Sequence, residues 1–344
     1  MSDCKIGILG AGAIGCYVGG RLATAGEDVV FIGRPRLKDE LLRSGLVLTD
    51  LEGGDVSVPK EKLAFSTELT ALADRDVILF CVKSAQTAEV AAELAGILGK
   101  GAIVVSLQNG LRNPEVLRAE LPGRLVLAGI VGFNVVWRGV GRLLRATSGP
   151  LVVEASADPR VKTLTRLLST CGFTVELPAD IRPLQWTKLI LNLNNAVSAL
   201  TDAPTPDLVF VPGYRRVLLA LMTEALAVLR AAGIRTARLG APIPVRFLPL
   251  MLRLPTPLLR LVARVQIKID REARSSMWDD LTKGRATEVD YLNGEIVRLA
   301  ESCGAAAPLN RRMVELVHEA EARKSGSPKL SASALWEALS RPPR

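Results

Sequence analysis

Apolar runs and helical periodicity alternate over the first part of the chain. Residues 5–9 (KIGIL) form the short apolar run of a buried strand, and a helical pattern over 16–25 follows and stops at Gly26. A second apolar run, 28–32, comes directly after it. A strand, a helix and a further strand in this order form a βαβ unit, so the pattern predicts an α/β fold built on a parallel sheet.

Further strands continue this sheet. Unbroken apolar runs at 76–82 and 102–107 are typical of parallel strands that are buried on both faces. The run at 125–131 is another strand candidate. These runs extend the predicted parallel sheet well beyond the first βαβ unit.

Shorter alternating stretches follow near 142–154 and 172–177, with a helical pattern over 160–171 between them. Alternation of apolar and polar residues predicts strands with one solvated face, and we expect antiparallel strands that extend the sheet. The segment 178–183 holds two prolines that interrupt the pattern, and it is the predicted domain boundary.

From residue 183 the pattern is helical almost throughout, which predicts an all-α second domain. The stretch 183–201 predicts one mostly buried helix, and it carries Lys188, Asn192, Asn194 and Asn195 in an apolar run. Lys188 and Asn192 are four residues apart and share a helix face. Buried polar groups need partners, so these side chains line either a polar cavity or a purely structural network between helices.

The rest of the second half contains one regular helix and one irregular stretch. Residues 214–232 are amphipathic, whereas 243–269 is an apolar stretch interrupted by prolines and five cations, which cannot span a membrane. We predict three parts: an N-terminal domain at 1–180, a helical domain at 181–330 and a C-terminal tail at 331–344.

Composition narrows the chemistry. Apolar residues make up 49% of the 344 positions and charged residues 23%, as in a globular chain with room for two domains. Five cysteines without CxxC spacing fit reduced cytosolic thiols better than a disulfide framework or a zinc site. His318 is the only histidine, so we expect no metal centre and a proton donor other than histidine.

The formal net charge is +9, a surplus that can serve nucleic acid, an anionic membrane or small phosphate-bearing ligands. Aromatic residues are few and do not alternate with Lys and Arg, so we expect neither nucleic acid nor a membrane as partner. The N-terminus shows no signal-peptide pattern, which predicts a cytoplasmic protein. The apolar second domain leaves a homodimer open.

A glycine-rich motif connects the first strand to the first helix. It has the form GxGxxG and consists of Gly10, Ala11, Gly12, Ala13, Ile14 and Gly15. Inside a complete βαβ unit, such glycines permit a tight turn and close approach of a pyrophosphate, whose charge the helix N-terminus stabilises. The motif therefore predicts a Rossmann-type dinucleotide-binding domain.

The end of the second strand indicates which dinucleotide is bound. An NAD site usually has Asp or Glu here, but this chain has Arg34, Arg36 and Lys38 and no acid before Asp39. Three cations suit the 2′-phosphate of NADPH/NADP, with Arg34 as the first choice of ligand. The alternative is a solvated basic loop without a specific role.

Polar residues follow two further strands at their carboxyl ends. Lys83 begins the segment after 76–82, and Asn109 lies in the segment after 102–107. Open α/β sheets bind ligands at this edge, so both residues are candidates for ligand contact. The alternative for Lys83 is an ordinary surface lysine at a helix start, a position that does not favour cations.

A polar cluster in the second half completes a set of motifs. The motifs are GAGAIG at 10–15, VKSAQ at 82–86, QNG at 108–110, W-x-K-L-x-x-N at 186–192 and SSM…D…GR-x-TE-x-D-Y-x-x-G at 275–294. In this order, and over nearly its full length, the chain resembles the ketopantoate reductase family (2-dehydropantoate 2-reductase).

The resemblance implies roles for residues of the second half. Lys188 matches the family's catalytic lysine, which acts as a general acid, and Glu288 matches a glutamate near both the lysine and the cofactor. Asn192 matches a substrate-binding asparagine, and Ser276 matches the serine that holds the substrate carboxylate. Asn195 is a further substrate-binding candidate, although many family members place the second asparagine one residue later, at the position of Ala196. Either a local bulge of the helix or a modified role would explain this shift.

The resemblance also implies roles in the first half. Lys83 and Asn109 match cofactor-contacting positions, and Asn109 is counted among the substrate-binding candidates as well. Arg34 matches the arginine for the 2′-phosphate, and Asn134 lies in a loop that approaches the nicotinamide.

The implied activity is NADPH-dependent reduction of a small 2-oxo acid, ketopantoate to (R)-pantoate, a step of pantothenate and coenzyme A biosynthesis. Two alternatives stay open: a reductase of another 2-oxo acid or a related imine that uses the same lysine, and a non-catalytic NADP-binding sensor. A sensor would need none of Lys188, Asn192, Ser276 and Glu288.

Overall fold

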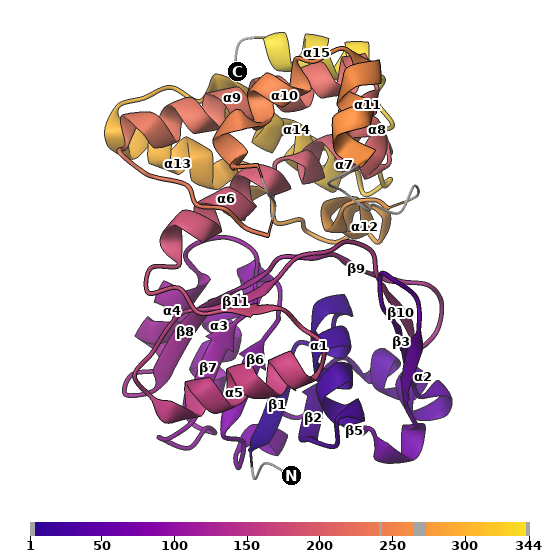
Figure 1. Cartoon of the computed structure of the whole chain (residues 1–344), viewed down its shortest axis with the longest axis vertical. Coiled ribbons are helices and arrows are strands. Elements are labelled where there is room, and N and C mark those ends of the chain that lie inside the picture. The colour runs from indigo at the N-terminus through magenta and orange to yellow at the C-terminus, as the bar shows by residue number, and fades with distance from the viewer. Residues whose placement is uncertain (1–3, 241–242, 265–272, 342–344) are drawn as a thin grey trace. The chain divides into compact units, whose positions relative to one another are not determined.

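The structure is a computed structural model that describes residues 4–240, 243–264 and 273–341. The chain divides into two compact units, Met1–Ile181 and Arg182–Arg344 (Figure 1). The first unit is built on β-sheets flanked by helices, and the described part of the second is helical. An α/β domain followed by a helical domain is the fold that the sequence pattern predicts.

An eight-stranded sheet is the frame of the first unit, with the strand order β12-β11-β8-β7-β6-β1-β2-β5. The strands from β5 to β8 along this order are parallel to their neighbours. The strands are β1 (Lys5–Leu9), β2 (Asp28–Ile32), β5 (Ala64–Ser66), β6 (Val77–Phe80), β7 (Ile103–Ser106), β8 (Leu125–Val131), β11 (Leu151–Val153) and β12 (Val175–Glu176).

Successive side chains of these strands enter two separate cores. Val77 and Leu79 of β6 belong to one hydrophobic cluster, whereas Ile78 and Phe80 belong to the other. A strand with a core on each face must be apolar at every position, which is why its sequence shows no alternation. The helices of this unit are α1 (Ala13–Thr24), α2 (Pro35–Ser44), α3 (Thr87–Ala95), α4 (Asn113–Glu120) and α5 (Pro159–Thr170).

The prediction for 142–154 was wrong in one respect. Only β11 joins the main sheet, antiparallel to β8, whereas β10 (Arg142–Arg145) belongs to a second, four-stranded sheet of order β4-β3-β10-β9. Its other strands are β3 (Leu46–Thr49), β4 (Asp55–Val58) and β9 (Val135–Trp137). The strand predicted at 172–177 is β12, which extends the main sheet as expected. It pairs parallel with its neighbour β11, and both strands run antiparallel to β8.

Glycines allow the chain to leave the main sheet and return to it. The Gly132 amide donates to the Pro150 carbonyl at 2.7 Å, which closes the excursion at its base. Gly149 has φ of +153°, and a Cβ there would lie 2.1 Å from the Gly132 carbonyl oxygen. Only glycine fits this close approach, so the excursion that carries β9 and β10 depends on it.

The second unit packs its helices around the long helix α9. Val217, Leu221, Ala225 and Val228 form part of its buried face at spacings of three and four residues, as the amphipathic pattern predicts. The helices are α6 (Arg182–Asn192), α7 (Asn194–Thr201), α8 (Thr205–Phe210), α9 (Pro212–Ala231), α10 (Leu248–Leu252), α11 (Thr256–Arg264), α12 (Ser276–Thr282), α13 (Asn293–Cys303), α14 (Pro308–Arg323) and α15 (Ala332–Ser340).

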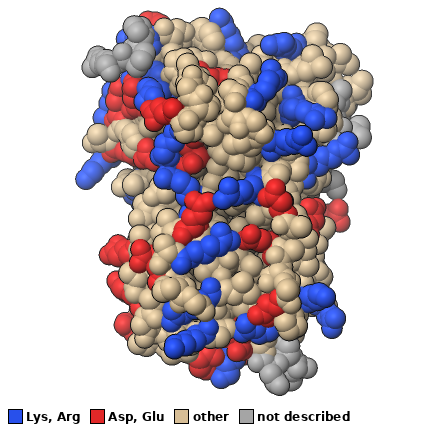
Figure 2. Space-filling model, turned by 90° about the vertical axis from the view of Figure 1, so that its left-hand side faces the viewer, with Lys and Arg blue, Asp and Glu red and all other residues tan. Residues whose placement is uncertain are grey.

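The structure describes most of two stretches of this unit that the sequence left irregular, 331–344 and 243–269. The expected tail at 331–344 contains α15, whose Leu335 and Leu339 are buried, because its apolar residues recur at helical spacing. The described part of 243–269 forms α10 and α11 after a short 3₁₀ turn, and 265–269 lie outside the described residues. None of the described helices has the length and apolar character needed to cross a bilayer. Figure 2 shows Lys and Arg side chains gathered at the upper right of the second unit.

Candidate functional site

The glycine loop after β1 is fixed by the strands on either side of it. The Gly10 and Ala11 amides both donate to the Ile32 carbonyl, at 3.1 and 2.9 Å. Gly10 has φ of +103°, and a Cβ there would lie 2.6 Å from the Val82 backbone nitrogen. The loop after β1 therefore touches the loop after β6, at the point where the strand order turns from one side of β1 to the other, which is where open α/β sheets bind ligands.

Gly15 and Gly12, the other two glycines of the motif, differ in the space around them. A Cβ on Gly15 would lie 2.3 Å from the Gly10 carbonyl oxygen, so this position packs α1 tightly against the turn. A Cβ on Gly12 would meet no atom within 4 Å. The backbone is thus open at Gly12, directly before the N-terminus of α1, where amide donors and the helix dipole favour an anion.

Arg34 lies at the rim of this loop. It precedes α2, two residues after Ile32, whose carbonyl the loop amides bind, and it is exposed. Arg36 is exposed as well, but its Nε donates to Glu40 at 2.9 Å within α2. Arg36 is therefore part of an ordinary helical ion pair, which leaves Arg34 as the better candidate for a phosphate.

A buried hydrogen-bond network joins the loops that follow β6 and β7. Gln108 Nε2 donates to the Val82 carbonyl at 3.0 Å and to Thr87 Oγ1 at 2.8 Å. Thr87 Oγ1 donates to Asn113 Oδ1 at 2.9 Å, and Asn113 Nδ2 donates to the Asn109 carbonyl at 2.6 Å. The network holds the backbone at Asn109 in place.

The same network reaches the segment that begins with Lys83. Asn113 Nδ2 also donates to Ser84 Oγ at 3.0 Å, and Ser84 Oγ donates to the Asn109 carbonyl at 3.2 Å. Lys83 itself precedes the 3₁₀ turn Ser84–Gln86. Sequence reasoning did not assign Asn113 a role, and its only signal was a polar residue before Pro114 at a helix start.

Asn134 lies in the excursion between β8 and β9. Its amide donates to Thr147 Oγ1 at 2.8 Å, and its carbonyl accepts from the Ala146 amide at 2.8 Å. The side chain is exposed. The backbone of this loop is therefore held on both sides, while the carboxamide is available to a ligand.

In the second unit, Lys188 lies on α6 among buried neighbours, with Leu184, Leu189 and Asn192 on the same helix. It is half-buried, and desolvation of the ammonium lowers its pKa to about 8. Burial disfavours the charged form of a lysine. The side chain thus becomes a much better proton donor near neutral pH than an exposed lysine.

The predicted single helix at 183–201 is in fact two helices. α6 ends at Asn192 and α7 begins at Asn194, and the Leu193 amide donates to the Ile190 carbonyl at 3.3 Å in a tighter turn. Asn194 Nδ2 donates to the Leu191 carbonyl. An asparagine side chain competes with the helix for backbone groups, which is the physical reason for the break.

The break between α6 and α7 affects the direction of Asn195, which lies one residue before the position of the second asparagine in many family members. Along an unbroken helix each residue turns by about 100°, so positions seven and eight after Lys188 would face differently. With a tight turn at Leu193, the direction of Asn195 no longer follows from that count. The structure therefore has a tight turn between two helices at this point, rather than the local bulge that was one of the two explanations from sequence.

Asn195 and Ser276 come from distant segments that the structure joins. Ser275 caps α12: its Oγ accepts from the Trp278 amide at 3.1 Å and donates to the Asn195 carbonyl at 3.0 Å. Ser276 is the next residue, exposed in the first turn of α12. The first turns of α7 and α12 are therefore held together.

Glu288 is buried in the loop before the 3₁₀ turn Val289–Tyr291. The residue before it, Thr287, donates its amide to Glu321 Oε1 on α14 at 2.6 Å. His318 on the same helix lies 2.8 Å from Glu321 Oε2 and 3.0 Å from Asp290 Oδ1. Burial opposes protonation of His318, but these two carboxylates outweigh it and raise its pKa. The histidine anchors this loop.

Metal and thiol chemistry receive no support from the described residues. Among residues 4–240, 243–264 and 273–341, no three His, Cys, Asp or Glu side chains are grouped as metal ligands would be. Cys81 follows β6 near the glycine loop, and burial raises its pKa to about 12, which keeps the thiol protonated.

Comparison with known proteins gives matches over most of the chain. Residues 6–158 match the family model described as "Ketopantoate reductase PanE/ApbA", and residues 180–321 match "Ketopantoate reductase PanE/ApbA C terminal". A relative from Halobacterium salinarum named 2-dehydropantoate 2-reductase is 30% identical over 328 residues, which cover 92% of this chain and 99% of that protein.

Solved structures share this fold. A PanE/ApbA family ketopantoate reductase from Ralstonia eutropha is 34% identical, with a TM-score of 0.77 over 93% of this chain and 99% of its own. D-mandelate dehydrogenase in complex with NADH and anilino(oxo)acetate shares the fold, with a TM-score of 0.74 at 22% identity over 93% of this chain and 99% of its own.

Proposed function

Because the chain belongs to the ketopantoate reductase family, we propose that it is an NADPH-dependent oxidoreductase that reduces 2-dehydropantoate (ketopantoate) to (R)-pantoate. The observation that carries this proposal is the half-buried Lys188 with a pKa of about 8, one helical turn from the buried Asn192. The first unit, Met1–Ile181, binds the cofactor, and the second, Arg182–Arg344, supplies the catalytic and substrate-binding residues.

The residues of the first unit fit an NADPH pyrophosphate. The backbone that is open at Gly12 and the amides at the N-terminus of α1 suit its charge, and Arg34 at the loop rim suits the 2′-phosphate. Lys83, Asn109 and Asn134 would contact the rest of the cofactor. When bound, NADPH supplies the hydride.

The chain's own residues handle the proton and the orientation of the oxo acid. Lys188 is largely protonated at neutral pH and gives its proton to the oxygen of the reduced carbonyl, which would otherwise be an alkoxide. Glu288 orients the lysine. Asn192 and Asn195 donate to substrate oxygens, with Asn109 at the cofactor side, and Ser276 holds the carboxylate.

The test is a steady-state assay with ketopantoate and NADPH beside an NADH control. Lys188→Ala is expected to lower turnover by about 10² to 10⁴-fold, the usual contribution of a general acid, with NADPH affinity near that of the wild type. Lys283→Ala is the matched control, because Lys283 is an exposed lysine paired with Asp279 at 2.7 Å. Equal turnover of the Lys188→Ala variant and the wild type would refute the proposed chemistry.

A second candidate is a reductase of a different 2-oxo acid or imine with the same lysine. The D-mandelate dehydrogenase complex, which shares the fold, contains an oxo acid with an aromatic substituent. A panel of 2-oxo acids and cyclic imines, with ketopantoate included, separates the two. A non-catalytic NADP-binding sensor would bind NADPH and turn over none of them.

We also propose a homodimer and a cytoplasmic location. Free thiols support the location: all five cysteines are unpaired. Support for the dimer comes from exposed apolar side chains in one part of the second unit: Val211, Phe247, Leu250, Leu258 and Leu261. Such clusters of exposed apolar residues mark association surfaces.

A further inference from the structure

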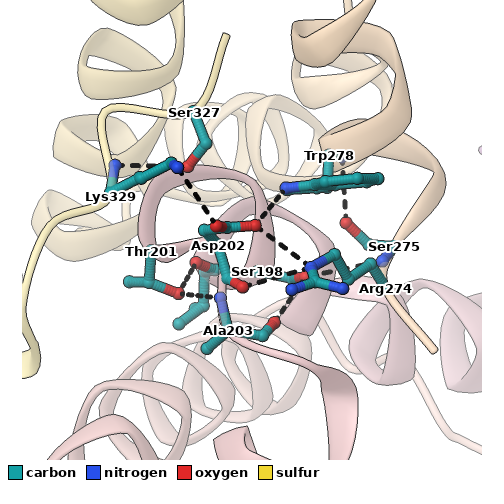
Figure 3. Close-up of polar contacts among 10 residues, drawn as sticks. Ser198, Thr201, Asp202, Ala203, Arg274, Ser275, Trp278, Ser327 and Lys329 are labelled. Atoms are coloured by element: carbon teal, nitrogen blue, oxygen red, sulfur yellow. Dashed lines mark hydrogen bonds and ion pairs between the residues drawn. The ribbon is translucent and has the colours of Figure 1, made fainter. Parts of the chain in front are cut away.

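At the end of α7 the chain turns through Asp202, whose carboxylate collects donors from distant segments. Trp278 Nε1 donates to Asp202 Oδ1 at 2.8 Å, and Arg274 Nε donates to the same oxygen at 3.1 Å. The Lys329 ammonium lies 3.7 Å from Oδ2. Figure 3 shows these side chains converging on one carboxylate.

The backbone of Asp202 is unusual. Its φ of 60° and ψ of 9° place it in the left-handed region directly after α7. L residues rarely adopt this conformation, and helices most often end with glycine there. A glycine would end α7 with less backbone strain, so an aspartate at this position indicates a use for its side chain.

The side chain acts on α12, which carries Ser276 in its first turn. Trp278 lies in that turn and Arg274 two residues before it, and the Arg274 guanidinium stacks 4.9 Å from the Trp278 ring centroid. Ser275 fastens the other side of the same turn to Asn195. Ser198 adds to this attachment, because its Oγ accepts from the Ser275 amide at 3.4 Å.

We infer that Asp202 is a positioning residue for the oxo acid: its carboxylate holds the start of α12 against α7, so that Ser276 stays in register with Asn195. This inference rests on the proposed function, in which both residues bind the substrate. Asp202 itself touches neither substrate nor cofactor in this account. It fixes one binding group relative to the other.

Two substitutions separate positioning from folding. Asp202→Gly removes the carboxylate and relieves the left-handed backbone, so its melting temperature is expected to stay close to that of the wild type. Asp202→Asn keeps an oxygen that accepts from Trp278 and tolerates the backbone, but it loses the charge that pairs with Arg274 and Lys329. Asp279→Asn is the control, because it removes an exposed ion pair from the same helix.

For Asp202→Gly we expect the KM of the oxo acid to rise about tenfold, the factor that corresponds to one lost hydrogen bond. The turnover number should change by less than about threefold, and the KM of NADPH should not change, because Ser276 and Asn195, which Asp202 positions, bind the oxo acid and not the cofactor. Asp202→Asn should fall between Asp202→Gly and the wild type. Unchanged oxo-acid KM in a folded Asp202→Gly variant would overturn the inference, as would equal losses for both substrates.

Hydrogen exchange measured by mass spectrometry supplies a readout that needs no activity. Asp202→Gly should speed exchange of the amides at 275–282 and leave those of α13 unchanged, whereas Asp279→Asn should alter neither. A wild-type protein that reduces no 2-oxo acid would refute the proposed function, and exchange alone would then decide whether Asp202 orders α12. Unchanged exchange at 275–282 would show that it does not.

Discussion

At the residue scale, the lowered pKa of Lys188 makes a prediction about pH. The ammonium form is the proton donor, and burial favours the neutral form, with a pKa of about 8. Below this pH the lysine is protonated and turnover is high, and turnover should fall as pH rises through about 8, by roughly tenfold per unit beyond it. The measurement is the turnover number at saturating substrates from pH 6 to 10.

Lys188→Arg provides the comparison for this profile. A guanidinium stays protonated across the range, so this variant should lose activity at every pH and also lose the decline near pH 8. A wild-type profile that is flat up to pH 10 would contradict the role of Lys188 as the titrating acid.

Arg34 makes a second prediction at this scale. Arg34→Ala should raise the KM of NADPH by about ten- to a hundredfold and leave that of NADH nearly unchanged, because a charge-assisted contact to a phosphate is lost. Arg36→Ala is the matched control, since Arg36 is paired with Glu40. Small and equal changes for both cofactors in Arg34→Ala would mean that this loop is only a solvated basic surface.

Single residues differ in how well the sequence predicts them. Gly10 and Gly15 could be assigned from sequence, because a turn with close backbone approaches leaves no other choice of residue at these two positions. The partners Gln108 and Asn113 could not, since their bonds reach residues more than twenty positions away. The order of the strands in the sheet decides which polar side chains of different loops come into contact. Local sequence patterns do not encode that order.

At the scale of elements, periodicity predicts strands and helices well and their interruptions poorly. The run 183–201 is apolar enough for one helix, yet Asn194 binds the Leu191 carbonyl and the helix divides at Leu193. Similarly, the alternation over 142–154 predicts strands but not that β10 would pair with β3, nearly a hundred residues earlier. Such strand pairings are set by tertiary structure and depend on turns such as the one at Gly149.

The division between α6 and α7 can be tested directly. Asn194→Ala removes the competing carboxamide and should lower the free energy of unfolding by about 1 kcal/mol, as for one hydrogen bond. It should also raise the KM of the oxo acid, because the orientation of Asn195 depends on the tight turn. Thr223→Ala is the control: its hydroxyl donates to the Leu219 carbonyl on an exposed face of α9. A loss of stability with unchanged KM would separate the turn from substrate binding.

At the scale of the whole molecule, composition indicates an uneven distribution of charge. Between residues 225 and 269 the sequence has eight Lys and Arg and no Asp or Glu. The exposed Phe247, Leu250, Leu258 and Leu261 lie in this same stretch. Sequence alone predicted a basic segment interrupted by prolines. It could not predict which leucines of this segment are exposed, because Leu252 and Leu259 belong to the same pattern and are buried in the structure.

Because cations and exposed apolar side chains occur together in this stretch, the stability of the proposed homodimer should depend on salt concentration. Contact through these apolar side chains would bring like charges of two copies together, so screening should strengthen it as the Debye length falls from about 10 Å at 0.1 M to about 3 Å at 1 M salt. The molar mass from light scattering should rise with ionic strength. A Leu250→Ser, Leu261→Ser double variant should stay monomeric, and Val140→Ser, an equally exposed change in the first unit, should behave as the wild type. A dimer that salt weakens, or that survives the double substitution, would place the contact elsewhere.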